Sequence, residues 1–216
     1  MAVPQTLPPP LESGDHLSRD EFHRRYLEHP EIKRAELVDG VVYVSSPVGF
    51  EHSEPHSLVV AWLVVYRTRM PGVRTSDNGT IFLPTGDEVQ PDGCLFRLHP
   101  EGRIRIIERR EGKRKAQYLE GTPDLVFEVA ASSASYDLHS KKQAYEQSGV
   151  PEYIVWQVYE RRITWFRLHE GRYIEVAPDE NGVIESAVFP GLRLAVTKML
   201  GGDEAGMLAA LDAGNS

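Results

Sequence analysis

Leu125-Val126-Phe127-Glu128-Val129-Ala130 is a run of apolar side chains with one carboxylate inside it. Neighbouring residues of a strand point to opposite faces, so such a run predicts burial on both sides, as in the middle of a mixed sheet that helices cover. Burying an ionised carboxylate costs several kcal/mol unless a cation or hydrogen bonds compensate. A charged or polar partner is therefore expected next to Glu128.

Further strands are predicted before and after this run. Residues 35–38 and 41–44 are β-rich and flank Asp39-Gly40, a pair typical of hairpin turns. Alternating arginine and isoleucine at 103–107, with residues 116–119, indicates a second hairpin across Glu111-Gly112. The other predicted strands are residues 80–83, 92–98, 153–158, 162–168 and 172–176.

Four helices are predicted among these strands. Ser18 and Glu21 form a capping box that opens a helix ending near residue 28. Between residues 54 and 70 apolar residues recur at three- and four-residue spacings until Pro71-Gly72 stops the pattern. A third helix is predicted at 138–148, with Asp137 as its N-terminal cap, and a short one at 203–212.

Length and composition favour one α/β domain. The chain has 216 residues, of which 41% are hydrophobic, which is enough for one substantial core. Residues 1–14 contain four prolines and few large apolar side chains, so we expect a disordered tail there. The expected domain spans residues 15–216 and consists of a mixed β-sheet flanked by helices, with extra β-hairpins.

The sequence indicates a cytoplasmic protein without a membrane partner. No segment approaches the roughly 18 apolar residues that cross a bilayer, and the N-terminal segment lacks the features of a signal peptide. The single cysteine, Cys94, excludes an internal disulfide and a cysteine-rich zinc site, and is expected to pack in the core.

The charge is acidic overall but unevenly distributed. A net charge of −8 argues against a protein that coats nucleic acid by bulk electrostatics. Residues 103–115, however, hold seven basic side chains and two acidic ones. This basic hairpin would either grip phosphates or form a solvated edge that resists aggregation, and the sequence does not separate the two.

Two carboxylates and a lysine are candidates for a catalytic site. Asp92 follows Pro91 and opens a predicted strand, and Lys141 lies early in the helix after the strand of Glu128. If the two strands are neighbours, the three side chains converge at one end of the sheet. Two oxygen ligands with room for water suit Mg²⁺, with Mn²⁺ as an alternative, and such a centre hydrolyses phosphodiesters. Lys141 would orient the attacking water or offset charge in the transition state.

Each candidate also has a structural interpretation. Asp92 is otherwise a turn residue at a strand start, and Glu128 a partner in a structural ion pair. Lys141 is otherwise a solvated helix lysine, for which Lys142 serves as an internal comparison. His52 and His56 would contact the substrate or simply pack on their helix.

The motifs resemble a large bacterial family of predicted restriction endonucleases in the PD-(D/E)xK superfamily. The resemblance covers about residues 20–195. It rests on Glu36-Leu37-Val38-Asp39-Gly40, the helix that contains His56, Pro91-Asp92, the Glu128 strand, Asp137-x-x-x-Lys141-x-x-x-Tyr145 and Gly149-Val150-Pro151-Glu152-Tyr153.

The resemblance implies a restriction endonuclease-like fold with Asp92 and Glu128 as metal ligands. The superfamily lysine usually stands two residues after the glutamate, where this chain has Ala130, so Lys141 would inherit the role, with Lys142 as the weaker claimant. Glu36 would be an additional acidic residue, either a metal ligand through water or an orienter of Lys141. Tyr145 would hold the lysine or fill the core, and we favour the core.

Three functions follow from these observations. The first is a Mg²⁺-dependent endonuclease that acts on DNA, working as a homodimer because each chain has one site for two strands. The second is a catalytically inactive descendant that binds DNA or protein, as Ala130, Ala131 and the acidic charge suggest. The third is a nuclease that acts on RNA or on branched or mobile-element DNA, since carboxylates at the phosphodiester carry no base information.

Overall fold

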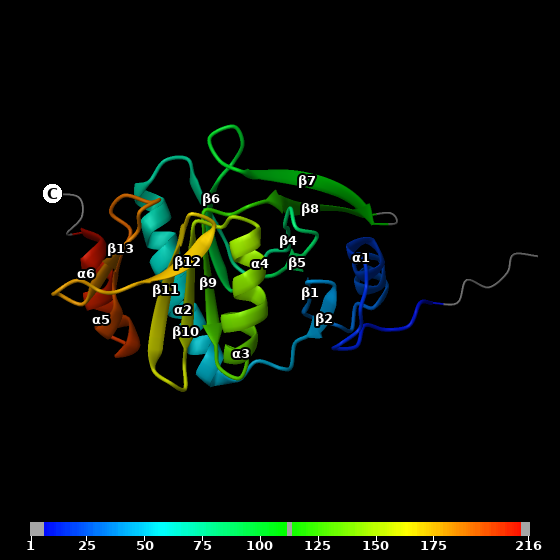
Figure 1. The fold of residues 1–216 in the computed structure, drawn as a ribbon, viewed down its shortest axis with the longest axis horizontal. Coiled ribbons are helices and arrows are strands. Elements are labelled where there is room, and N and C mark those ends of the chain that lie inside the picture. Colours follow the sequence, from blue (N-terminus) through cyan, green and yellow to red (C-terminus); the bar gives the residue numbers. More distant parts are fainter. Residues whose placement is uncertain (1–6, 112–113, 213–216) are drawn as a thin grey trace, which may run out of the picture.

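The computed structural model describes residues 7–111 and 114–212 and has the expected α/β architecture (Figure 1). Its strands form two six-stranded sheets and one two-stranded sheet in these residues. The main sheet has the order β12 (Arg172–Val176), β11 (Arg162–His169), β10 (Glu152–Gln157), β9 (Leu125–Ala130), β6 (Gly93–Arg97) and β3 (Val73–Ser76). Strands β9 and β10 are parallel and the other neighbours are antiparallel, so the sheet is mixed, as predicted.

The two predicted hairpins lie in one second sheet rather than separately at the edges of the first. Its order is β2 (Val41–Val44), β1 (Ala35–Val38), β5 (Glu88–Val89), β4 (Ile81–Phe82), β8 (Arg114–Gly121) and β7 (Ile104–Glu111). The β1–β2 turn has positive φ at Asp39 (52°) and Gly40 (72°), as a two-residue hairpin of type I′ requires. The second hairpin is longer than predicted, and Gly112 and Lys113 of its turn lie outside the described residues.

Helices cover both faces of the main sheet (Figure 1). Helix α2 (Phe50–Arg69) packs on one face, together with α5 (Val196–Leu200), α6 (Glu204–Asp212) and the hairpin of β13 (Val183–Glu185) and β14 (Arg193–Ala195). Helix α2 begins four residues before the predicted start, because its first turn precedes Pro55. Helix α1 (Arg19–Glu28) begins as predicted, with the Ser18 hydroxyl accepting from the Glu21 N–H at 3.4 Å.

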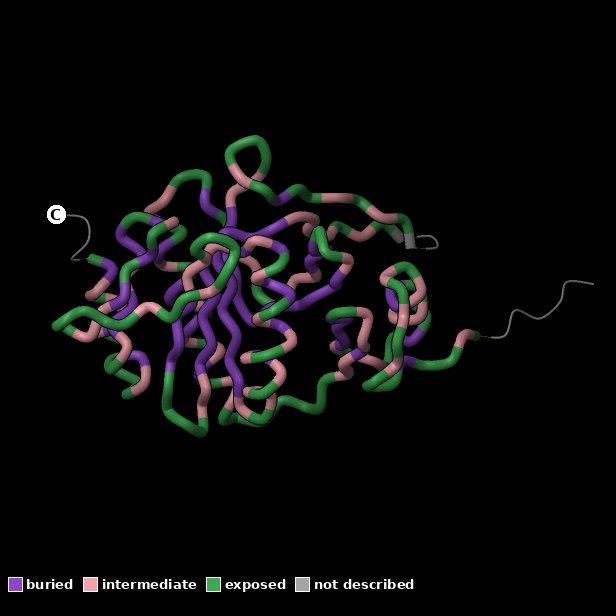
Figure 2. The backbone as a smooth tube through the Cα atoms, in the orientation of Figure 1, coloured by how far each residue is buried: buried purple, intermediate pink, exposed green. Residues whose placement is uncertain are grey.

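Strand β9 divides the core into two layers, as its apolar run predicts. All six of its residues are buried (Figure 2). Leu125, Phe127 and Val129 pack in the cluster with α2, whereas Val126 and Ala130 pack in the cluster on the opposite face. Because Glu128 alternates with the first set, its side chain faces the second cluster, toward the helical segment that follows β9. Cys94 is buried in this second cluster.

The prediction that Asp137 caps the helix after β9 is wrong. The helical segment after β9 comprises α3 (Ala134–Tyr136), a π-helical turn η1 (Asp137–Lys141) and α4 (Lys142–Gln147). Since the segment begins at Ala134, Asp137 lies inside it and does not cap it; its carboxylate accepts from the Ser133 hydroxyl at 2.6 Å. Single π-turns inside helices are frequent at functional sites.

Part of the predicted tail contacts the second sheet. Leu11 is buried with Phe22 and Val42, and the Gly14 N–H donates to the Val42 carbonyl at 2.8 Å. Residues 1–6 lie outside the described range, and the boundary between residues 14 and 15 stays a prediction. Among the helices described, none is both long and apolar enough to span a membrane.

The packing of α2 on β9 should contribute measurably to the free energy of unfolding. Trp62 is fully buried, its ring contacts Phe127 edge-on, and its indole N–H donates to the Arg193 carbonyl. Trp62→Ala should lower the free energy of unfolding by about 3–5 kcal/mol in urea denaturation, because it leaves a cavity. Ile106→Ala, at an exposed position of β7, is the control and should change it by less than about 0.5 kcal/mol. Similar losses in both variants would contradict this packing.

Candidate active site

Asp92 and Glu128 lie side by side because their strands pair. Antiparallel β6 and β9 align Gly93 with Phe127, which places the residue before β6 next to Glu128. The Asp92 N–H donates to Glu128 Oε2 at 3.3 Å, and the Val129 N–H donates to Asp92 Oδ2 at 2.8 Å. Both carboxylates are about 98–99% buried, with relative exposures of 2% and 1%. The convergence expected from the sequence is therefore present.

Lys141 is the buried cation of this site. Its Nζ lies 2.6 Å from Glu128 Oε1 and 3.0 Å from Glu36 Oε1, and its side chain is 1% exposed. Burial would lower the pKa of Lys141, but the carboxylates of Glu128 and Glu36 raise it, so the ammonium stays charged. Lys141 is not a solvated helix lysine. Lys142 points instead to the ring of Phe166, with its Nζ 4.3 Å from the ring centre.

Glu36 and Tyr145 hold this arrangement from two directions. Glu36, on β1 of the second sheet, accepts from the Gln90 N–H at 2.7 Å and contacts Lys141 through both carboxylate oxygens. Tyr145 is fully buried, and its hydroxyl donates to Glu128 Oε1 at 2.9 Å. Tyr145 therefore belongs to the core, as favoured, but it also holds Glu128 rather than the lysine.

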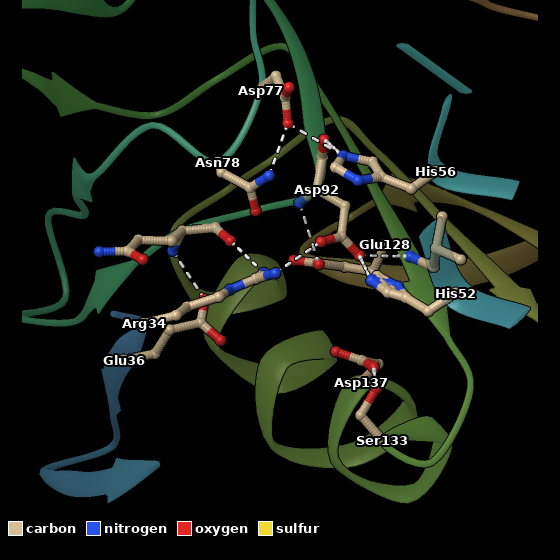
Figure 3. Close-up of polar contacts among 12 residues, drawn as sticks. Arg34, Glu36, His52, His56, Asp77, Asn78, Asp92, Glu128, Ser133 and Asp137 are labelled. Carbon is tan, nitrogen blue, oxygen red and sulfur yellow. Dashed lines mark hydrogen bonds and ion pairs between the residues drawn. The ribbon is translucent and has the colours of Figure 1, made fainter. Parts of the chain in front are cut away.

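Arg34 is also a member of the site, although it is not among the residues predicted from the sequence. Its Nη1 lies 2.9 Å from Asp92 Oδ1 and its Nη2 donates to the Gln90 carbonyl at 2.5 Å (Figure 3). The signal was available, because Arg34 stands two residues before Glu36 and residues at this spacing share a face of a strand. Asp137 also joins the site, 3.9 Å from Lys141 Nζ.

The two histidines of α2 contact Asp92 rather than packing alone. His56 Nε2 lies 2.8 Å from the Asp92 carbonyl oxygen and 3.0 Å from Asp77 Oδ1. His52 Nε2 lies 3.6 Å from Asp92 Oδ2, and the two imidazole rings are stacked at 5.6 Å (Figure 3). Burial lowers the pKa of His52 despite the nearby Asp92 carboxylate.

A pocket of about 350 Å³ lies between both sheets, α2 and the helical segment after β9. Its walls include Arg34, Glu36, Asp92, Glu128 and Lys141. No described residue of the basic hairpin β7–β8 lines it, and several of the hairpin's charges form ion pairs with each other. Of the basic residues proposed there, Lys113 lies outside the described part of the chain.

The pocket holds more negative than positive charge. Four carboxylates, those of Glu36, Asp92, Glu128 and Asp137, face the cations of Arg34 and Lys141. Burial raises the pKa of Glu128 to about 8, because Lys141 does not fully offset desolvation and the other carboxylates. Burial likewise raises the pKa of Asp137 to about 6.

The charge at Asp92 is stabilised in a different way. Burial would raise its pKa, but Arg34, Lys141 and the hydrogen bond from the Val129 N–H hold that pKa below its usual range. The same burial therefore has opposite outcomes at the two neighbours, because the pKa of Asp92 is lowered and that of Glu128 is raised. Within the described residues, no three His, Cys, Asp or Glu side chains are grouped so as to enclose a metal ion by themselves.

The arrangement of this mixed sheet and its helices is also found in a solved structure. This structure, that of a putative nuclease belonging to DUF820 from Anabaena variabilis ATCC 29413, has the same fold with a TM-score of 0.65. It is 15% identical, and the match covers 90% of this chain and 99% of that one, so the likeness concerns the fold.

The family of this chain is assigned from its sequence. Residues 19–197 match the model of the Uma2 family, described as "Putative restriction endonuclease", and the chain belongs to that family. No curated protein matches the chain.

The raised pKa of Glu128 predicts a pH-dependent stability. In the cation-free protein the free energy of unfolding should fall as the pH rises from about 4.5 to about 8, since the folded state holds a proton that the unfolded chain has released. Glu128→Gln imitates the protonated side chain and should remove most of this decline. Urea denaturation in EDTA at several pH values in this range measures the free energy of unfolding of both proteins. If it declined with pH equally in the wild type and Glu128→Gln, the raised pKa would not belong to Glu128.

Proposed function

We propose that this protein is an endonuclease of the PD-(D/E)xK type that hydrolyses DNA phosphodiester bonds with a divalent cation. The observation that carries the proposal is the 2.6 Å contact of Lys141 Nζ with Glu128 Oε1, next to Asp92, at the wall of a pocket. Membership of a family described as restriction endonucleases supports it. A single site per chain favours a homodimer for cutting both strands.

The donor set fits Mg²⁺ or Mn²⁺ held by Asp92 and Glu128. Glu128 Oε1 is engaged by Lys141 and Tyr145, whereas Oε2 accepts one long bond of 3.3 Å and has capacity for a cation. Two carboxylates without a third side-chain ligand suit an ion that keeps several waters. When bound, the cation would polarise the phosphoryl oxygen and lower the pKa of a water.

The chain's own residues supply the remaining functions. An ammonium group has three N–H donors, and Glu36 and Glu128 take two of those of Lys141. The third is left to orient the attacking water at the wall of the pocket. Glu36 and Tyr145 fix this geometry, because each holds one partner of the Lys141–Glu128 pair.

A second candidate is an inactive nuclease-fold protein that binds DNA or another protein. The ion pair between Arg34 and Asp92 favours it, because that pair neutralises Asp92 without a metal. The net charge of −8 also disfavours strong nonspecific attraction to DNA. Cleavage assays separate the two candidates, and an RNA substrate in the same assay tests the third interpretation from the sequence.

The nuclease proposal predicts which lysine is essential. Glu128→Ala and Lys141→Ala should each lower Mg²⁺- or Mn²⁺-dependent cleavage of plasmid and single-stranded DNA by about 10²-fold or more. Lys142→Ala, one residue along the helix, should cut at the wild-type rate. Equal losses in both lysine variants, or no cutting by the wild type with any cation or substrate, would contradict the proposal.

The metal ligands can be tested without activity. The double variant Asp92→Asn with Glu128→Gln should lose Mn²⁺ binding measured by calorimetry, because both oxygen ligands are then neutral amides. Glu175→Gln, an exposed carboxylate in an ion pair on β12, is the control and should bind Mn²⁺ as the wild type does. Mn²⁺ affinity retained by the double variant would place the ion elsewhere.

A further inference from the structure

We propose that Arg34 binds the phosphate that is cleaved and that, before substrate arrives, it occupies the oxygen of Asp92 that a cation would share. The inference rests on the nuclease function proposed above and deepens it, because it assigns the substrate's phosphate to a residue at the start of a strand of the second sheet. Arg34 directly precedes β1, whose residue Glu36 contacts Lys141.

The pocket's charges leave Arg34 as the cation that a phosphate can reach. An entering phosphate is repelled by the carboxylates of the wall, so it requires a positive partner. Of the Lys and Arg side chains lining the pocket, Lys141 is 1% exposed and held between carboxylates, whereas Arg34 is 21% exposed. Arg34 therefore presents the accessible positive charge in this pocket.

The hydrogen-bonding capacity of Arg34 is only partly used. A guanidinium carries five N–H donors in a planar fork that matches phosphate geometry. One Nη1 donor contacts Asp92 and one Nη2 donor contacts the Gln90 carbonyl, while the buried Nε has no partner among the described residues. One donor on each Nη therefore remains besides the buried Nε, which is more than a purely structural clamp on Asp92 needs.

The contact with Asp92 couples phosphate binding to cation binding. Arg34 Nη1 occupies Asp92 Oδ1, so the guanidinium competes with any cation that binds this carboxylate. A phosphate brings negative charge that Arg34 can pair with instead. Arg34 should therefore weaken metal binding to the free protein and strengthen nucleic-acid binding, two effects of opposite sign.

A purely structural role for Arg34 predicts a different pattern. If Arg34 only positioned Asp92, removing it would misplace a metal ligand, and metal affinity and nucleic-acid affinity would fall together. The two roles are thus separated by the direction in which metal affinity changes, which does not depend on catalytic activity.

The experiment compares Arg34→Gln, Arg34→Lys and the control Arg162→Gln, whose arginine pairs with Glu175 on the exposed edge of the main sheet. Calorimetry measures the Mn²⁺ affinity of each free protein. Fluorescence anisotropy measures binding of a labelled DNA oligonucleotide with Ca²⁺ in place of Mg²⁺, under conditions where gel analysis shows the DNA to be intact. Thermal unfolding confirms that each variant is folded.

We expect Arg34→Gln to bind DNA about tenfold or more weakly than the wild type and to bind Mn²⁺ more tightly than the wild type. Unchanged Mn²⁺ affinity would overturn the proposed competition between Arg34 and the cation. Arg34→Lys should recover part of the DNA affinity, because it keeps the charge but not the fork. Arg162→Gln should match the wild type in both. The inference would be overturned if Arg34→Gln bound DNA within about twofold of the wild type, or if it lost Mn²⁺ affinity in parallel with DNA affinity. Cleavage by the wild type would still uphold the nuclease function in that case. A wild type that neither binds Mn²⁺ nor cuts DNA would overturn both.

Discussion

The buried ammonium of Lys141 is the interaction on which the site depends. It joins Glu36 of the second sheet, Glu128 of the main sheet and the π-turn of the helical segment between them. A carboxylate in the middle of an apolar strand is tolerated only with such a partner, and removing one member of a buried pair typically costs about 3–5 kcal/mol. The same contact therefore stabilises the junction of the two sheets and brings the reactive groups together.

This one cation does not balance the charge around it. With Arg34 included, two positive side chains face four carboxylates. Burial raises the pKa of Glu128 to about 8, and the neighbouring carboxylates add to this rise. Unbalanced buried charge and a perturbed pKa in a pocket wall are typical of functional sites. A core built only for stability would pair these charged groups or omit them. A divalent cation at Asp92 and Glu128 would supply the missing positive charge, and a phosphate would then find Arg34 within the same pocket.

Much of this site is predictable from local sequence, and the remainder depends on long-range pairing. Glu128 is conspicuous in its apolar strand, Asp92 follows a proline at a strand start, and both positions are set by strands long enough to predict. Asp137 was misassigned because an aspartate before a helical run usually caps it, and the π-turn leaves no local signal. The second sheet was missed because it closes through β4 and β5, which have two residues each.

Isothermal titration of Mn²⁺ into the protein at about pH 7, in buffers with different ionisation enthalpies, is the most direct test of this account. Because the pKa of Glu128 is raised to about 8, the side chain is mostly protonated at that pH and must release its proton to bind a cation. We expect one ion to bind per chain with release of about one proton, and we expect Glu128→Gln to lose that release. Absence of binding, or binding without proton release, would contradict this expectation.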